Sequence, residues 1–332
     1  MMYQRIKGLL IGCAYGDAMG MPSEMMTRET MKKAFPNGIH SFMPSSRYDF
    51  IGRNLEAGKV TDDTINTLLV WKSIVENHGI FNVDVYLSLL QQWISVHQEI
   101  AHLIMGPSTL KALNLIEKGI PLSETGKFGT TNGACMKVSG IGVINDYREL
   151  HKLIKEVEKL CLPTHNSTIA IMGASVIAAI VSYVIRGGKD IEAIWDIAYQ
   201  AIEMSKKYGN PLPSPSLKSR MDWVKQCLMR NSDSDCSLKE IENFLGCGME
   251  TIETVPTVMA VLTLSQLEPR KCAQLCANLS GDTDTIGAIA TGISGAVQFT
   301  FQSNEIALLK KVNHIDFDSY AEQLCQFVTD IT

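Results

Sequence analysis

The 332-residue sequence lacks most patterns that mark redox, dinucleotide-binding or nucleic-acid-binding proteins. Its nine cysteines are scattered and never spaced as Cys-x-x-Cys, which favours free, mostly buried thiols in a reducing cytosol. No Gly-x-Gly-x-x-Gly occurs, and almost no stretch alternates with period two, so a parallel sheet that holds a dinucleotide is not expected. Lys and Arg (30) are fewer than Asp and Glu (35), with no basic run that would follow a nucleic acid.

Membrane and secretion signals are also weak. The apolar N-terminal stretch is interrupted by Asp17 and is not followed by an Ala-x-Ala cleavage site. The run from Ile169 to Ile185 is slightly short for a membrane span of about 20 residues. It is also rich in the small residues that suit tight helix packing. We therefore expect a cytoplasmic protein in which this run is a buried helix.

What the sequence does contain is helical periodicity along most of its length. Apolar residues recur at helical spacing in 83–99, where His97 would continue a buried stripe, and in 148–161. The polar stretch 230–237 is expected to be a loop. The chain is long enough for a large core, and the linker-like stretch 209–215 has helical patterns on both sides. The prediction is an all-α fold in which residues 1–332 form a single domain.

Glycines in the first expected helix carry a packing prediction. Gly8, Gly12 and Gly16 stand four residues apart in the run 5–21, so they share one helix face. Glycine costs about 1 kcal/mol relative to alanine inside a helix, so three of them need a reason. Close approach by the backbone of another helix supplies it.

Two short clusters of aspartate and threonine, more than 200 residues apart, each begin an apolar helix. Residues 61–64 read Thr-Asp-Asp-Thr before the helical run 65–75, and residues 280–285 read Ser-Gly-Asp-Thr-Asp-Thr before the run 286–301. Buried carboxylates are costly unless something positive neutralises them. The alternative is that both clusters are ordinary helix caps, because aspartate and threonine are favoured at that position.

Carboxylates and hydroxyls are hard oxygen donors, which suit Mg²⁺, Mn²⁺ or Ca²⁺, and no cysteine lies in either cluster to favour zinc. Six such side chains are too many for one Mg²⁺ that keeps several waters, and about right for a pair of ions. The interpretation that we favour is a two-ion centre. Its predicted ligands are Thr61, Asp62, Asp63, Asp282, Asp284 and Thr285.

Further candidates lie outside the two clusters. The small-residue loop 126–133 precedes a helical stretch and would suit an anion such as phosphate, although many such loops are only turns. His165 stands at a loop-to-helix junction, which leaves function and structure equally open. Glu24 follows a helix end beside a proline and is the better catalytic candidate, whereas Asp17 is expected to be a buried hydrogen-bonding group.

Five motifs occur in an order typical of one family: residues 16–20 with Glu24, 61–64, 132–136, 164–166 and 281–285. On these motifs the chain resembles the ADP-ribosylglycohydrolases, which include the dinitrogenase-reductase-activating glycohydrolase and the ADP-ribosyl-acceptor hydrolases. The resemblance runs end to end and is greatest to an uncharacterised bacterial branch. It implies an orthogonal all-α bundle and two Mg²⁺ ions, or Mn²⁺, held by the same six residues.

The resemblance also implies roles for individual residues. Glu24, Asp62 and Asp284 would be the catalytic carboxylates, and the substrate would contact Thr130, Thr131, Asn132, Gly133 and His165. The family often has glycine at position 131 and arginine at position 137, where this chain has Thr131 and Lys137. Lysine cannot reproduce the fork of donors that arginine offers. The diphosphate grip is therefore expected to differ, and a smaller ribosyl substrate stays open.

The expected activity is hydrolysis of an N- or O-glycosidic bond at C1 of a ribose, with ADP-ribose removed from a modified protein or small molecule. Three alternatives stay open: a metal-dependent nucleoside or ribosyl N-glycosidase, a non-catalytic ADP-ribose binder or structural protein, and a two-metal phosphate-ester hydrolase. The intact Asp/Thr set argues against a pure binder, which has little need for six hard ligands. The leaving group and the oligomeric state are not determined by the sequence.

Overall fold

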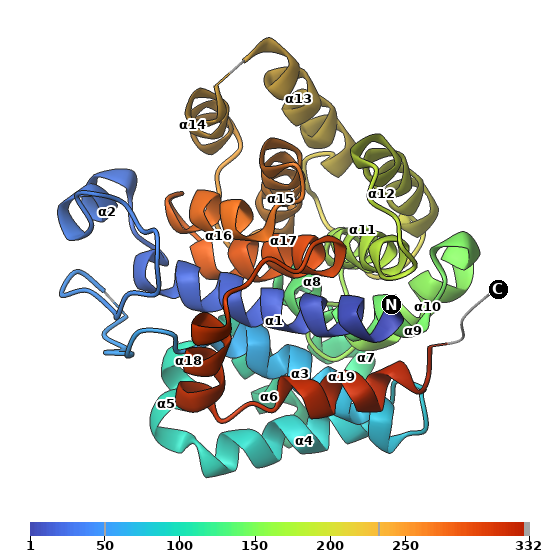
Figure 1. The fold of residues 1–332 in the computed structure, drawn as a ribbon. Coiled ribbons are helices and arrows are strands. Elements are labelled where there is room, and N and C mark those ends of the chain that lie inside the picture. Colours follow the sequence, from blue (N-terminus) through green and yellow to red (C-terminus); the bar gives the residue numbers. More distant parts are fainter. Residues whose placement is uncertain (50, 232, 329–332) are drawn as a thin grey trace.

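The computed structural model describes residues 1–49, 51–231 and 233–328, and within them the chain is helical without named strands. Figure 1 shows a bundle in which helices cross at steep angles around a central pair. Helices in this part of the chain are α1 Met2–Gly20, α2 Arg28–Ala34, α3 Asp62–Glu76, α4 Val83–Val96, α5 Gln98–Ile104, α6 Pro107–Glu117, α7 Leu122–Thr125, α8 Gly133–Lys137, α9 Ser139–Ile144, α10 Leu150–Cys161, α11 Thr168–Ile185, α12 Ile191–Ser205, α13 Leu217–Arg230, α14 Ser234–Phe244, α15 Thr251–Ser265, α16 Pro269–Ala277, α17 Thr283–Val297, α18 Ser303–Asn313 and α19 Phe317–Cys325, with 3₁₀ turns η1 Met21–Ser23 and η2 Tyr147–Glu149.

The central pair is α1 and α17, which run antiparallel in close contact. A Cβ added at Gly8 would lie 2.1 Å from the carbonyl oxygen of Gly295, and one at Gly16 would lie 2.0 Å from that of Gly287. Such distances are far below van der Waals contact, so only glycine permits this approach. The glycine-face prediction is confirmed. The antiparallel arrangement also brings the end of α1 to the beginning of α17, where the second acidic cluster lies.

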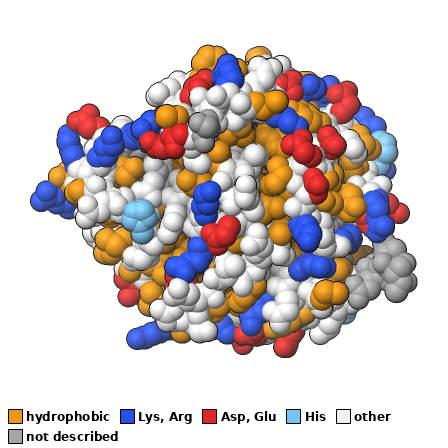
Figure 2. All heavy atoms as spheres, turned by 45° about the horizontal axis from the view of Figure 1, so that its top comes forward, with side chains coloured by type: hydrophobic (Ala, Val, Ile, Leu, Met, Phe, Trp, Pro, Cys, Tyr) orange, Lys and Arg blue, Asp and Glu red, His pale blue; other side chains and the backbone are white. Residues whose placement is uncertain are grey.

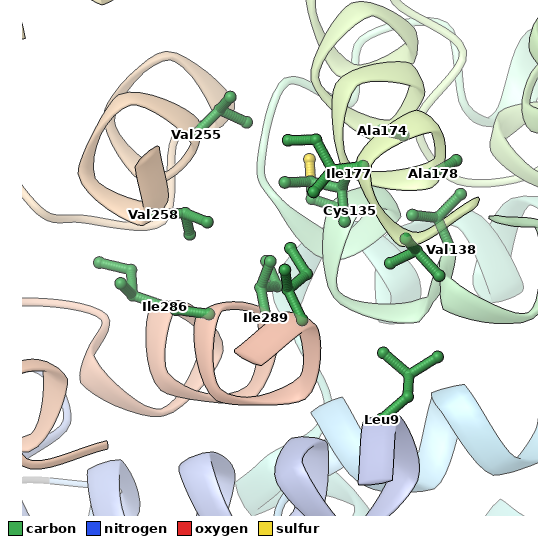
Figure 3. Packing of buried hydrophobic residues seen from close by; sticks show 14 of the residues in the cluster. Leu9, Cys135, Val138, Ala174, Ile177, Ala178, Val255, Val258, Ile286 and Ile289 are labelled. Carbon is green, nitrogen blue, oxygen red and sulfur yellow. The ribbon is translucent and has the colours of Figure 1, made fainter. Parts of the chain in front are cut away.

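The helix α11 lies behind this pair in the interior. It is long and apolar enough to cross a membrane, but 83% of it is buried among other helices, as in the core helix of a globular protein. Figure 3 shows Ile177 and Ala178 of α11 near Val138, which lies between α8 and α9, and near Ile289 of α17. The prediction of a buried helix is confirmed.

One hydrophobic cluster extends along the chain from Ile6 in α1 to Leu324 in α19. It contains residues of the long helices on both sides of the loop 209–215, which supports the prediction of a single domain. The surface in Figure 2 mixes acidic and basic side chains over the face shown.

Two sequence predictions need correction. His97 does not continue a buried stripe: it is exposed where α4 gives way to α5, and its ring stacks on Trp93 at 4.5 Å. The stretch 230–237 is not wholly a loop, because α14 already begins at Ser234. The carboxylate of Asp233 accepts a hydrogen bond from the backbone N–H of Cys236 and caps that helix. Ser232 lies outside the described residues.

Candidate active site

Asp17 fixes the first acidic cluster from the neighbouring helix α1. Its carboxylate accepts hydrogen bonds from the backbone N–H groups of Thr61, at 2.9 Å, and Thr64, at 3.1 Å, and from both hydroxyls, at 3.0 and 2.6 Å. Free N–H groups at the start of a helix need acceptors, and here another helix provides one. Asp17 is therefore a buried hydrogen-bonding group, as predicted, and it sets the position of α3 relative to α1.

A second link places Glu24 beside the other cluster. The chain after η1 forms an isolated antiparallel bridge between Met26 and Gly281, with hydrogen bonds of 2.7 Å from Met25 N–H to Gly281 and 3.1 Å from Gly281 N–H to Met26. The side chain of Thr283 also donates to the carbonyl of Gly20 at 2.8 Å. The connection that carries Glu24 is thus attached to the loop that leads into α17.

The carboxylates gather into two overlapping groups. Oxygens of Asp17, Asp63 and Asp284 lie within 4.8 Å of one another, and so do oxygens of Glu24, Asp282 and Asp284. The aspartates are buried, and Asp284 belongs to both groups. Two clusters more than 200 residues apart in sequence therefore form one acidic centre, as the sequence predicted.

The donor set fits hard divalent cations. The hydroxyl of Thr61 faces Asp63 at 3.1 Å and Asp284 at 3.4 Å, and that of Thr285 faces Asp63 at 3.3 Å. The other oxygen of Asp63, Oδ1, is buried without a hydrogen-bond partner. A buried carboxylate oxygen without a partner is costly. Carboxylate and hydroxyl oxygens suit Mg²⁺, Mn²⁺ or Ca²⁺. The residues present therefore fit such ions.

The electrostatics of the buried aspartates also favour bound cations. Burial raises the pKa of Asp17 to about 6 and that of Asp62 to about 8, with Glu24 adding repulsion at Asp62. Burial, and then repulsion within the cluster, also raises the pKa values of Asp63, Asp282 and Asp284. A cluster that resists ionisation without counter-ions gains much from bound cations, because they favour the charged carboxylates.

We predict that the metal-free protein loses stability as pH rises from about 4 to 8. Unfolded aspartates have pKa values near 3.9. The folded pKa values of Asp17 and Asp62 are higher, so the folded state holds more protons in this window and rising pH favours unfolding. Each fully shifted group contributes about 1.4 kcal/mol per pH unit. Urea unfolding in EDTA across this range measures the slope. Saturating Mg²⁺ should flatten it, and a metal-free stability that rises with pH would contradict the prediction.

Arg53, which the sequence reasoning missed, lies inside the acidic centre. It comes from the long loop between α2 and α3, its side chain is 2% exposed, and it pairs with Glu24 and lies 3.9 Å from Asp284. It also donates to the backbone carbonyl of Met21 at 3.1 Å. Burial opposes its charge, but Glu24, Asp284 and Asp49 outweigh burial and raise the pKa of Arg53. No sequence motif marks this residue, and the one signal that could have found it is the unusual length of the loop 35–61, since long loops are often functional.

Replacement of Arg53 by methionine is expected to destabilise the metal-free protein by about 3–5 kcal/mol, because loss of one partner leaves buried charges unpaired. Arg47→Met on the same loop is the matched control, since Arg47 is exposed. Urea unfolding of both variants in EDTA makes the measurement. Equal stabilities of the two variants would show that Arg53 does not neutralise the cluster.

The acidic centre forms one side of a cavity of about 220 Å³. The opposite wall comes from the start of α6 and from the loop before α8, where the amide of Asn132 donates to Asp282 at 2.5 Å and to Thr254 at 2.8 Å. Gly133 has a packing reason to be glycine, because a Cβ there would lie 2.7 Å from the ring of His165. The loop and the histidine thus form one surface facing the acids.

Most predicted residues meet at this cavity. Those that line it are Glu24, Asp62, Asp63, Thr131, Asn132, Gly133, His165, Asp282, Asp284 and Thr285. Thr61 lies behind the lining, with its hydroxyl on the carboxylates. Thr130 also lies outside the lining, and its carbonyl accepts from Thr251 N–H at 3.1 Å. Lys137, expected near a diphosphate, does not line the cavity and is fully buried.

The family model described as ADP-ribosylglycohydrolase matches residues 2–298, most of the chain. The chain belongs to the ADP-ribosylglycohydrolase family. Three further similarities extend over almost the whole chain. The uncharacterised protein YegU of Escherichia coli K12 is 35% identical over 98% of both chains. The ADP-ribosylhydrolase ARH3 of Xenopus tropicalis is 26% identical, over 97% of this chain and 95% of its own. A solved structure titled as an ADP-ribosylglycohydrolase-related protein complex has a TM-score of 0.72 at 18% identity over 99% of both chains.

These findings confirm the recognised family and the all-α fold. The structural neighbour supports the fold alone, because its identity is low. Family membership makes the chain a hydrolase of glycosidic bonds, and the family is metal-dependent in general. The buried acidic centre is consistent with that dependence.

Proposed function

We propose that this ADP-ribosylglycohydrolase-family protein hydrolyses the glycosidic bond at C1 of a ribose and releases ADP-ribose from a modified acceptor. The observation that carries the proposal is one cavity with buried hard-donor carboxylates on one side and a Thr-Asn-Gly loop with His165 on the other. The proposed ligands of two Mg²⁺ ions, or Mn²⁺, are Thr61, Asp62, Asp63, Asp282, Asp284 and Thr285. The proposed location of the protein is the cytoplasm, in keeping with its seven buried free thiols.

Bound divalent cations would supply positive charge that orients a water and the ribose hydroxyls and stabilises charge in the transition state. The chain itself supplies positioning and proton transfer. Glu24 is the least buried carboxylate of the centre and lines the cavity, so it can accept the proton of the attacking water. Asp62 and Asp284 are the other proposed catalytic carboxylates. Asp62 is held by the backbone N–H of Gly106, at 3.0 Å.

The second wall has the complementary task. Asn132 holds Asp282 in place and keeps the loop against the acidic centre. Thr131 and His165 offer a hydroxyl and an imidazole face to the sugar and its substituent, and Gly133 lets the loop pack closely against the His165 ring. Enclosure by both walls lowers the dielectric around the reacting bond, which strengthens every charge interaction there.

A metal-dependent nucleoside or small ribosyl N-glycosidase is the second candidate, and one observation favours it. No lysine or arginine side chain is among the described residues that line the cavity, and Lys137 is buried behind the wall. A diphosphate bound there would depend on backbone N–H groups and hydroxyls. A smaller ribosyl substrate would not need a cation at that wall.

Incubation with a substrate panel, with and without Mg²⁺, separates these functions. The panel contains proteins with ADP-ribose on arginine or serine, O-linked small ADP-ribosyl compounds and free nucleosides, and mass spectrometry identifies the products. Free ADP-ribose from a modified acceptor supports the first proposal, free base from nucleosides supports the second, and inorganic phosphate points to an esterase. No product from any substrate, with ADP-ribose still bound, would indicate a binder.

A further inference from the structure

Lys137 is a buried cation for which the proposed reaction has no direct use. It is the last residue of α8, it is fully buried, and it lies behind the cavity wall. Its ammonium donates to the hydroxyl of Tyr86 at 3.1 Å and to that of Thr164 at 3.3 Å, and it lies 5.1 Å from the centre of the Tyr86 ring. The acceptors of the Lys137 ammonium in the described structure are hydroxyls, and each hydroxyl has a further hydrogen-bond partner of its own.

One hydrogen-bond chain runs from Lys137 to the cavity. Thr164 Oγ1 lies 2.7 Å from His165 Nδ1, and His165 Nε2 lies 3.0 Å from Thr131 Oγ1. Thr131 Oγ1 in turn lies 3.0 Å from Ser108 Oγ, and Ser108 lines the cavity. A buried lysine is thereby connected to the surface that a ligand would touch.

The chemistry of the ammonium fixes the direction of this chain. An ammonium has three donors and no acceptor, so Lys137 occupies a lone pair of Thr164. Thr164 is 1% exposed, and the remaining partner of its hydroxyl is Nδ1 of His165, so the Thr164 proton must point to that nitrogen. A neutral imidazole with Nδ1 as acceptor carries its proton on Nε2.

The direction continues beyond the ring. Nε2–H of His165 then donates to Thr131, and a Thr131 proton directed at Ser108 Oγ, 3.0 Å away, continues the chain in the same sense. In that arrangement the proton of Ser108 faces the cavity. Burial, and then the charge of Lys137, lowers the pKa of His165 well below its usual range, in agreement with a neutral ring.

A second chain leads from Lys137 to the acidic centre. The hydroxyl of Tyr86, which accepts from Lys137, donates to Asn66 Oδ1 at 2.8 Å. The amide of Asn66 then donates to the backbone carbonyl of Asp62 at 2.9 Å. The same donor-only group thus also orients the amide that supports the first turn of α3.

We propose that Lys137 is a positioning residue that fixes the polarity of both chains, holds His165 as the Nε2–H tautomer and presents Ser108 to the ligand as a hydrogen-bond donor. The cavity wall at Ser108 then selects a ligand oxygen that has no proton to give, such as a phosphoryl oxygen. The tautomer does not depend on any activity. Only the ligand preference rests on the proposed function.

Nitrogen-15 NMR of the imidazole groups tests the tautomer, with the His165 signals assigned by their loss in His165→Gln. In the wild-type protein at neutral pH, Nδ1 is expected to be unprotonated and Nε2 protonated. Lys137→Met should give a tautomer mixture or the Nδ1–H form, whereas Lys137→Arg should keep the wild-type pattern, because a guanidinium also only donates. Lys155→Met, at an exposed position of α10, is the matched control.

A protonated or Nδ1–H ring in the wild type would overturn the proposal, and so would an unchanged tautomer in Lys137→Met. If Lys137→Met does not fold, judged by circular dichroism, Thr164→Val replaces it. That variant removes the link to His165 and leaves Tyr86 with Lys137, so it should also release the tautomer, and an unchanged ring there would overturn the proposal equally.

Binding of free ADP-ribose in Mg²⁺, measured by calorimetry, tests the ligand preference. Ser108→Ala and Lys137→Met should each weaken ADP-ribose binding roughly tenfold, with Lys155→Met unchanged. Binding unaffected by both variants would overturn the preference. If the wild type binds no ADP-ribose, the proposed function and the preference fail together, while the NMR result still decides the tautomer.

Discussion

Excess EDTA is expected to abolish turnover of the ribosyl substrate, with a loss of at least about a thousandfold, and Mg²⁺ or Mn²⁺ should restore it. The reason is the buried acidic centre, in which Asp63 has an oxygen without a partner and Asp284 is shared by both carboxylate groups. Divalent cations are worth several kcal/mol of charge stabilisation in a transition state, and each 1.4 kcal/mol is a factor of ten. Residual metal is measured on the same sample.

The variant Asp284→Asn tests the metal centre in a second, independent way, because it should change metal binding and metal-free stability in opposite directions. Loss of the shared carboxylate should weaken Mg²⁺ binding by at least about a hundredfold and remove activity. In EDTA at pH 8, however, the same change should raise the free energy of unfolding. Burial, and then repulsion from the neighbouring carboxylates, raises the pKa of Asp284, and the amide of asparagine carries no charge to bury or repel. Calorimetric Mg²⁺ titration and urea unfolding measure the two effects.

The control for Asp284→Asn is Asp196→Asn, at an exposed position of α12. It makes the same chemical change away from the cavity and should alter neither quantity. Full turnover in metal-free protein, or Mg²⁺ affinity equal in Asp284→Asn and Asp196→Asn, would refute the two-ion centre. Either result would leave the family assignment intact and would require another source of positive charge.

The second large effect concerns the helix pair that carries the site. Gly12→Ala should destabilise the protein by about 2–3 kcal/mol although alanine is the better helix former. Helix propensity favours alanine by about 1 kcal/mol. A Cβ at this position, however, would lie 2.3 Å from the carbonyl oxygen of Thr291, so α1 and α17 would have to separate. Overpacking costs about 1–3 kcal/mol and occasionally more. Against rigid backbone at this distance we expect about 3–4 kcal/mol, which exceeds the gain in helix propensity by about 2–3 kcal/mol.

Urea unfolding in saturating Mg²⁺ measures this change, and Gln4→Ala is the control, because Gln4 is exposed on the same helix. Gly12→Ala should also weaken Mg²⁺ binding, since separation of the pair moves Glu24 away from Asp282. A variant as stable as the control would mean that the two helices can adjust without cost and that glycine is not required there.

The structure decides between helix caps and a shared acidic centre, and it changes where a diphosphate would have to bind. Caps alone do not account for the two Asp/Thr clusters, because Asp17 rather than the clusters satisfies the start of α3 and the remaining carboxylates face one another. Lys137 is buried and cannot touch a diphosphate directly, so a diphosphate would have to bind to the cavity wall that contains Thr131 and Ser108. The buried lysine acts, in our proposal, through His165 and Ser108.

The sequence by itself determined the class of fold, the close helix contact and the metal-site candidates. Those features depend on local chemistry: helical periodicity, glycines on one face, and hard donors at helix starts. The five ordered motifs led to the family that the comparisons confirm. The roles of individual site residues stay predictions, now with a common cavity to support them.

Only the tertiary structure decided what surrounds these residues. Arg53 has no local signature, because its place among the carboxylates depends on how a long loop folds back over Glu24. The exposure of His97 depends on where α4 ends, and the direction imposed by Lys137 depends on hydroxyls from α4 and from the loop before α11. Periodicity reports which face of a helix is buried, whereas partners across the core are set by packing between segments distant in sequence.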